Sequence, residues 1–173
     1  MYKVLLLIFL SIFSNADWLV NGKIISDTDN MKISKNLAVQ LWLTDKESEL
    51  LKNWNTPSKG VEIPTTNKIK IYKTLTAFII FKGCKTDSKG NCNLTMDITV
   101  YQPDGKLYVT YLNKEVWKNR PTPPNNSLGL SVDLLRFIME PDEQMGIYKI
   151  DVILTDHFAN KKIKLSSSFT VYK

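Results

Sequence analysis

The chain has few of the residues on which enzymes and metalloproteins depend. Its 173 residues include one histidine and two cysteines, and no G-x-S-x-G segment presents a serine nucleophile. The histidine, His157, lies among turn-forming residues, where a solvent-exposed side chain is expected. A catalytic triad built on it would need a partner that the sequence does not place, and a zinc centre would be short of ligands. We therefore predict a noncatalytic protein with no catalytic residues, no metal and no cofactor.

Long apolar runs are almost absent as well. One run, residues 4–13, follows a single positive charge at Lys3 and precedes the segment Ser14-Asn15-Ala16. This order is typical of a secretory signal peptide, and the run is shorter than the roughly twenty residues that a transmembrane helix needs. We predict a signal peptide over residues 1–16 and a mature protein that is periplasmic or secreted, with no transmembrane segment after cleavage.

Arginine is scarce, since the chain contains Arg120 and Arg136 and no others. Without the first 16 residues, 157 residues remain, with 22 lysines and arginines against 17 acids and a formal charge of +5. Lysine lacks the planar fork with which arginine binds phosphate, so we predict that nucleic acid is not a partner. We interpret the lysines as spread over solvated faces.

The two cysteines, Cys84 and Cys92, flank a segment of turn formers, Asp87-Ser88-Lys89-Gly90-Asn91. In an exported protein such a pair predicts a disulfide, here at the base of a hairpin loop between two strands. The alternative is a redox or metal-binding pair. It is disfavoured because the spacing matches neither C-x-x-C nor a zinc knuckle.

Much of the chain alternates between apolar and polar residues, which is the period of half-buried strands. The clearest strand predictions are residues 37–43, 94–100, 148–154 and 163–171, and others are 107–112, 128–132 and 135–139. Residues 69–72 and 75–81 are apolar on both faces over part of their length, as expected of central or covered strands. Turns are predicted at 102–105 and 156–161. Three prolines between residues 113 and 127 predict a long loop there.

One helix is predicted over residues 45–54. Thr44 and Glu47 have the spacing of a capping box, in which the glutamate folds back onto the residue before the helix. Leu50, Leu51 and Trp54 supply a narrow apolar stripe for docking.

These patterns predict an all-β fold, an antiparallel immunoglobulin-like β-sandwich of about seven to nine strands with one short helix near residues 45–54. Residues 17–36 are expected to form an N-terminal arm or edge strand, and residues 37–173 a single sandwich domain. The segment from Glu140 to Tyr148 leads into a long alternating strand like the penultimate strand of immunoglobulin domains, and Tyr148 has a position like their tyrosine corner. The chain lacks the Cys…Trp…Cys arrangement of antibody domains, because Cys84 and Cys92 are too close in sequence to join opposite sheets.

Several short motifs follow one another between residues 37 and 171. They are Trp54-Asn-Thr-Pro57, Phe81-Lys-Gly-Cys84, Gly90-Asn-Cys92, Pro103-Asp-Gly105, Trp117, the prolines at 121–124, and Glu140-Pro to Gly146-Ile-Tyr148. In this combination the chain resembles a group of small, uncharacterised exported bacterial proteins with an immunoglobulin-like fold. The resemblance implies a bacterial envelope location and a sandwich fold, and brings no activity, cofactor or catalytic residue.

Aromatic residues are the candidates for binding. Trp54 ends the predicted helix, and Trp117 lies in the predicted long loop beside Lys118 and Arg120. This mixture suits stacking on a sugar, a peptide or a partner surface. The alternative is that both rings anchor irregular segments onto the sandwich, where a large ring supplies burial.

Two acidic segments have simpler interpretations. Residues 27–30 carry clustered oxygen ligands but lack the glycine and the distal glutamate of a calcium loop, so we interpret them as a solvated turn. Asp142 and Glu143 are expected to keep their loop hydrated.

We therefore predict an exported, noncatalytic binding or accessory module of the bacterial envelope, whose partner is another envelope protein or a surface ligand. Two alternatives stay open. One is a hydrolase or enzyme inhibitor with an unrecognised site. The other is a structural envelope subunit that self-assembles through an exposed sheet edge.

Overall fold

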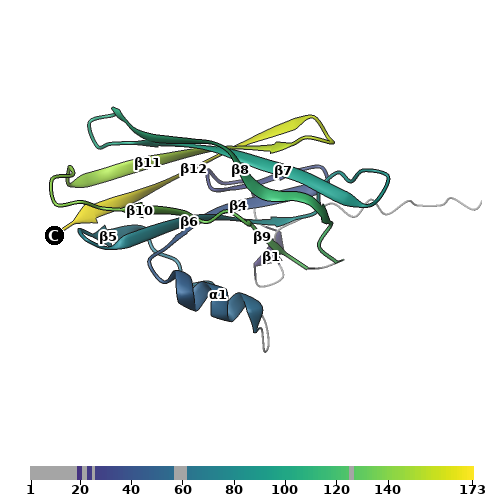
Figure 1. Cartoon of the computed structure of the whole chain (residues 1–173), viewed down its shortest axis with the longest axis horizontal. Helices are drawn as coiled ribbons and strands as arrows, with labels where there is room; N and C mark the ends of the chain where they lie inside the picture. The colour runs from purple at the N-terminus through teal and green to yellow at the C-terminus, as the bar shows by residue number, and fades with distance from the viewer. Residues whose placement is uncertain (1–18, 21–22, 25, 57–61, 125–126) are drawn as a thin grey trace, which may run out of the picture.

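A computed structural model describes residues 19–20, 23–24, 26–56, 62–124 and 127–173 (Figure 1). The predicted signal peptide, residues 1–16, lies outside the described residues. The strands are β1 (Leu19–Val20), β2 (Lys23–Ile24), β3 (Met31–Ser34), β4 (Leu37–Thr44), β5 (Lys68–Lys70), β6 (Thr74–Lys82), β7 (Asn91–Tyr101), β8 (Leu107–Pro121), β9 (Gly129–Leu130), β10 (Leu135–Ile138), β11 (Gly146–Asp156) and β12 (Lys161–Tyr172), and the helix is α1 (Glu47–Asn55).

Two sheets pack face to face. The first, which we call the helix-covered sheet, has the order β10-β6-β4-β3, with β9 also paired to β6. The second, which we call the open sheet, has the order β5-β12-β11-β7-β8. Within the described residues every strand pair is antiparallel except β5 with β12. The predicted all-β, immunoglobulin-like sandwich with one helix is confirmed.

The strand order is that of an immunoglobulin domain. In the open sheet, β12, β11 and β7 occupy the places of strands G, F and C, and β8 extends that sheet as in variable-type domains. In the helix-covered sheet, β4, β6 and β10 occupy the places of strands A, B and E. The β6–β7 connection and the β11–β12 turn therefore correspond to the B–C and F–G loops.

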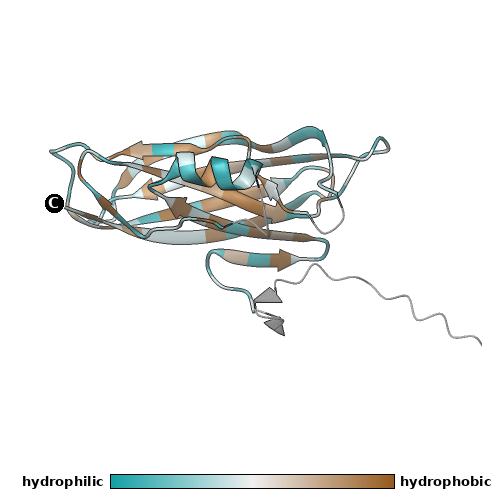
Figure 2. Ribbon diagram, turned by 90° about the horizontal axis from the view of Figure 1, so that it is seen from below, coloured by the Kyte–Doolittle hydropathy of each residue, from teal (hydrophilic) through white to brown (hydrophobic). Residues whose placement is uncertain are grey.

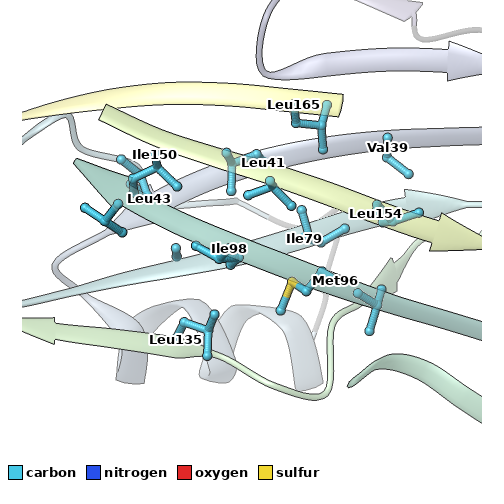
Figure 3. Packing of buried hydrophobic residues seen from close by; sticks show 14 of the residues in the cluster. Val39, Leu41, Leu43, Ile79, Met96, Ile98, Leu135, Ile150, Leu154 and Leu165 are labelled. Atoms are coloured by element: carbon cyan, nitrogen blue, oxygen red, sulfur yellow. The ribbon is translucent and has the colours of Figure 1, made fainter. Parts of the chain in front are cut away.

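The main core lies between the two sheets, where the apolar faces of the alternating strands meet (Figure 3). Val39, Leu41 and Ile79 of the helix-covered sheet face Met96 and Ile150 of the open sheet, and all five are almost completely buried. Burial of such side chains contributes about 25 cal/mol per Å² of apolar surface removed from water. The apolar positions of the alternating strands in the sequence are therefore the positions that form this core.

A second, smaller core lies under α1 on the outer face of the helix-covered sheet. Leu50 of the helix contacts Phe78, Ile80 and Leu130, and Trp54 packs against their edge. Figure 2, which shows the molecule from below, has α1 lying across this sheet. Because the helix covers the outer face, β6 is buried on both sides over most of its length.

Two predictions of connectivity were wrong. β6 and β7 belong to different sheets, so the segment between them is a crossover from one sheet to the other and not a hairpin loop. The predicted loop at residues 113–127 is strand as far as Pro121, because β8 continues along the edge of the open sheet. Left-handed backbone at Asn113 (φ 53°) and Asn119 (φ 52°), together with shifts in register, breaks the alternation that would have revealed the strand.

The capping box was also predicted wrongly. The Oγ1 atom of Thr44 accepts a hydrogen bond from the backbone N–H of Lys46, 2.9 Å away, ahead of the first helical residue. The carboxylate of Glu47 turns instead to Arg136 on β10 and to Thr76 on β6. A charged partner in the tertiary structure replaces the local cap.

Candidate binding surface

One end of the sandwich gathers segments that are far apart in the sequence. The β6–β7 crossover, the β11–β12 turn and the end of β8 lie together at the right of Figure 1, opposite the C-terminus. The backbone N–H of Thr122 donates to the carbonyl of Gly90 (3.2 Å), and that of His157 donates to the carbonyl of Asn93 (3.0 Å). We call residues 35–36, 82–90, 118–124 and 157–162 the loop end.

The loop end is held by a disulfide and by one buried carboxylate. Cys84 and Cys92 form the predicted disulfide, with Cα atoms 6.0 Å apart, which ties the crossover to the start of β7. The carboxylate of Asp156 accepts hydrogen bonds from the backbone N–H groups of Lys85 (2.8 Å), Phe158 (3.1 Å) and Ala159 (3.0 Å). The crossover and the β11–β12 turn are therefore fixed to each other.

Asp87 organises the tip of the crossover. Its Oδ1 atom accepts the backbone N–H groups of Lys89 (2.9 Å) and Asn91 (2.8 Å), and Gly90 adopts a left-handed φ of 82°. The hydrogen bond from Asn91 is the main reason why the pKa of Asp87 lies below its usual value. The predicted turn chemistry of residues 87–91 is confirmed.

The exposed surface of the loop end is rich in cations. The two acids of these segments and of the adjoining end of β11, Asp87 and Asp156, already accept backbone hydrogen bonds. Among the described residues Arg120 has an ionic partner, Glu115 at 3.4 Å, and the six exposed lysines have none. The exposed cations are Lys35, Lys85, Lys89, Lys118, Arg120, Lys161 and Lys162.

Trp117 lies at this end, on β8 and not in a loop. Its ring meets Phe81 of the main core edge to face, with centroids 5.6 Å apart, and its Nε1–H donates to the carbonyl of Pro121 (2.8 Å). The guanidinium of Arg120 covers the ring at 5.3 Å from its centroid. The ring is half-buried, so it attaches the end of β8 to the core and presents Arg120 above it.

The sequence candidates do not form one cluster. Trp117, Lys118 and Arg120 share the loop end, where Lys118 is exposed and lies opposite Asn93 in the register of β7 and β8. Trp54 packs under α1 on the outer face of the helix-covered sheet, in the second core. One further aromatic residue is at the loop end: Phe158, in the β11–β12 turn, is 40% exposed.

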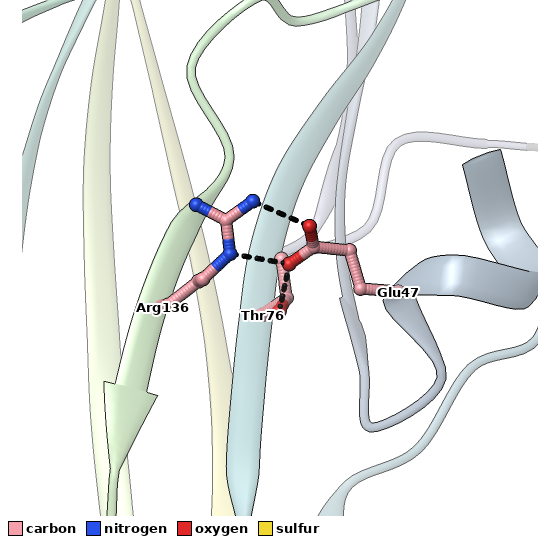
Figure 4. A network of polar contacts seen from close by, with 3 residues as sticks. All are labelled: Glu47, Thr76 and Arg136. Atoms are coloured by element: carbon pink, nitrogen blue, oxygen red, sulfur yellow. Dashed lines mark hydrogen bonds and ion pairs between the residues drawn. The ribbon is translucent and has the colours of Figure 1, made fainter.

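A bidentate ion pair fixes α1 to its sheet (Figure 4). The Nε of Arg136 donates to Glu47 Oε2 (2.7 Å), its second nitrogen contacts Oε1, and the hydroxyl of Thr76 also donates to Oε2 (2.9 Å). The hydrogen bond from Arg136 is the main reason why the pKa of Glu47 lies below its usual value. The pair explains the position of the helix and leaves neither charge free for a ligand.

A second carboxylate, Glu143, is engaged at the opposite end of the sandwich. The hydroxyl of Tyr108 donates to Glu143, and Tyr148 stacks on Phe169 with centroids 5.2 Å apart. Burial, followed by the hydrogen bond to Glu143, raises the pKa of Tyr108 far above its usual range, so this phenol stays neutral. The expectation that Glu143 keeps its loop hydrated was wrong, whereas Asp142 is exposed.

Tyr148 has the position of a tyrosine corner but not its hydrogen bond. Its hydroxyl is buried without a hydrogen-bond partner among the described residues, as is Oε2 of Glu143. Burial is the main reason why the pKa of Tyr148 is raised, and the charge of Glu143 adds to it.

A shallow groove of about 520 Å³ crosses the outer face of the open sheet. Lys149 and Asp151 form an ion pair of 2.9 Å in it, and the hydroxyl of Ser166 donates to Asp151 (2.8 Å). Acidic and basic side chains are equal in number along this groove, whereas basic side chains predominate at the loop end. The charged residues that line it are Asp29, Lys32, Asp97, Lys149, Asp151 and Lys164.

The remaining candidates from the sequence behave as ordinary turns. His157 is exposed, as predicted, with Nε2 at 2.8 Å from the hydroxyl of Thr95. In residues 27–30, Asp27 accepts the backbone N–H of Ile33 (3.0 Å), and the amide of Asn30 donates to the carbonyl of Leu41 (3.2 Å).

The described residues contain no group of three or more histidine, cysteine or acidic side chains placed to hold a metal, and no helix long and apolar enough to cross a membrane.

We did not predict from the sequence that the exposed lysines gather at the loop end. Lys85, Lys89, Lys161 and Lys162 all lie in or beside predicted turns, and this concentration of one charge in turn segments was the available signal. We interpreted the lysines as spread over solvated faces because the sequence does not say which turns share an end. Asp156 carried a clearer signal, an aspartate that opens a predicted turn.

No protein-family model matches the chain, and no curated protein does. Solved structures match at low identity. A family 123 glycoside hydrolase from Clostridium perfringens is 12% identical, with a TM-score of 0.44, over 80% of this chain and 27% of that chain. A Niemann-Pick type C2 protein from the Japanese carpenter ant is 10% identical, with a TM-score of 0.39, over 61% of this chain and 79% of that chain.

An immunoglobulin-like protein from Pseudomonas aeruginosa is 15% identical, with a TM-score of 0.34, over 78% of this chain and 91% of that chain. This chain therefore spans about a quarter of the glycoside hydrolase and most of the other two proteins. These likenesses concern the fold alone, and none of them assigns a ligand or a reaction to this chain.

Proposed function

We propose that the protein is an exported, noncatalytic binding module of the bacterial envelope, periplasmic or secreted, that contacts an anionic partner through the loop end. The observation that carries the proposal is the set of exposed lysines there, which have no ionic partner among the described residues while both local acids are engaged with backbone N–H groups. Charge left unpaired on a rigid frame is available to a partner.

The architecture supports this assignment. Loops on a rigid β scaffold commonly carry the contacts of such domains, and the disulfide and Asp156 hold these loops in one arrangement. The B–C and F–G loops of immunoglobulin variable domains form their binding end, and the equivalent connections form the loop end here, an analogy at the level of the fold. The disulfide and the predicted signal peptide support an oxidising compartment.

The test is a crosslinking pull-down from the cell envelope of the producing organism, using the tagged secreted protein. Captured proteins, lipids and glycans are identified by mass spectrometry. The loop-end variant is Lys161→Gln/Lys162→Gln. The control is Lys68→Gln/Lys73→Gln, which removes the same charge at two exposed positions of the opposite end.

We expect one envelope component to be enriched by the wild type and by the control but lost from the loop-end variant. Equal enrichment by all three proteins, or no enrichment by any, would overturn the proposal. Circular dichroism and melting temperatures of the variants establish that a loss of capture is not a loss of folding.

A further inference from the structure

We propose that the anionic partner of the loop end is a lipid bilayer surface, on which the protein docks end-on with Phe158 in the headgroup region. This inference rests on the proposed function and names the class of its partner. It follows from the kind of cations present, from their placement, and from the exposed aromatic ring among them.

The cations suit an extended surface more than a small anion. They are lysines apart from Arg120, and lysine acts as a point charge that does not require planar, bidentate geometry. They lie on turns and strand ends of four separate segments, whereas a small ligand needs polar groups that converge in a concave site. A layer of lipid phosphates can contact all of these dispersed charges at the same time.

Phe158 is the feature that favours a bilayer over a soluble polyanion. Its ring is 40% exposed at the tip of the β11–β12 turn, and Lys161 and Lys162 follow it at the start of β12. A ring amid lysines is the composition of surfaces that lie at a membrane interface, where the ring enters the headgroup layer and the lysines meet anionic lipids.

The turn is built to present this ring. The carboxylate of Asp156 holds the backbone N–H of Phe158, and the N–H of Asn160 donates to the carbonyl of His157 (3.4 Å). The turn is also tied to the crossover that carries Lys85 and Lys89. The turn that carries the ring and the crossover that carries two of the lysines are therefore held in one arrangement, which lowers the entropic cost of docking.

The test is co-sedimentation of the secreted protein with vesicles. One set is phosphatidylethanolamine containing about a quarter phosphatidylglycerol, and the other is zwitterionic phosphatidylcholine. Each lysine near an anionic surface contributes about a fivefold gain in partition, so Lys161→Gln/Lys162→Gln should lower binding to anionic vesicles by about tenfold or more. Phe158→Ser should lower it several-fold, and Lys68→Gln/Lys73→Gln should leave it nearly unchanged.

Binding should also fall steeply when salt is raised to about 0.5 M, because the Debye length then drops to a few ångströms. Equal binding to both kinds of vesicle, an equal loss in the control pair, or no binding would overturn the inference. If the envelope pull-down still captures a protein or a glycan through the loop end while vesicles are not bound, the proposed function stands and the lipid assignment fails. If neither assay depends on the loop-end lysines, both fail.

Discussion

Single carboxylates fix the positions of whole segments in this protein. Asp156 joins the β11–β12 turn to the crossover, and Glu47 joins α1 to the helix-covered sheet. The partners of Glu47 lie 29 and 89 residues away along the chain, so no local pattern announces them. In the sequence, Glu47 shows the spacing of a capping box. In the structure its carboxylate pairs with Arg136 instead of capping the helix.

Replacing Glu47 by glutamine should destabilise the protein more at neutral pH than at acidic pH. The pKa of Glu47 is lowered from 4.5 in the folded protein, chiefly by Arg136, so its carboxylate stabilises the fold fully above about pH 4.5 and this contribution is lost as the pH falls through the lowered pKa. Because the Arg136 side chain is 55% exposed, we expect about 1 kcal/mol or less.

Urea denaturation of the wild type and of Glu47→Gln at about pH 7 and pH 3 measures this difference. A difference in free energy of unfolding that is as large at pH 3 as at pH 7 would mean that the helix is held by packing around residue 47 and not by its charge.

At the scale of elements, two glycines constrain the crossover between the sheets in different ways. Gly83 has a φ of 74°, and a Cβ atom added there would lie 1.9 Å from the carbonyl oxygen of Asn36 in the β3–β4 turn. Gly90 has a similar φ of 82°, with nothing within 4 Å of such an atom. The two glycines share one conformational demand and differ in the space around them.

Gly83→Ala should therefore cost more stability than Gly90→Ala. Both substitutions place a side chain in the left-handed region, at about 1 kcal/mol, and the first also forces two backbone segments apart, for a total of about 3 kcal/mol or more. Urea or thermal denaturation of both variants measures the difference. Equal losses would show that the crossover and the β3–β4 turn separate easily.

The β8 strand is longer than its sequence pattern predicts. Its last part contains Trp117 and ends at Pro121, and residues with positive φ interrupt its alternation. A proline at the end of an edge strand costs no ladder hydrogen bond, so the sheet extends to a residue that the sequence pattern assigns to a loop. The same extension carries Arg120 to the loop end.

At the scale of the whole molecule, the long edge of the open sheet is partly covered. The backbone N–H of Val132 donates to the carbonyl of Val116 (3.1 Å), and that of Asp133 donates to the carbonyl of Glu115 (2.9 Å). The carboxylate of Asp133 in turn accepts the N–H of Glu115 (2.7 Å). Covered edges and irregular register are devices that oppose pairing between molecules.

We therefore expect the purified protein not to assemble through β8. Its sedimentation coefficient should stay constant over about a hundredfold range of concentration, and Asp133→Ala, which frees the N–H of Glu115, should increase self-association. Asp142→Ala, an exposed loop position, is the matched control. Concentration-dependent assembly of the wild type would favour the structural-subunit alternative instead.

The sequence by itself determined the all-β class, the disulfide, the turns at residues 87–91 and 102–105, and most strand positions. These features depend on alternation and turn chemistry between residues that are close along the chain. Only the tertiary structure decided that β6 and β7 lie in different sheets, that Glu47 pairs with Arg136, and that lysines from four segments share one end. Those outcomes depend on pairing and packing between distant residues, whose free energies no local pattern contains.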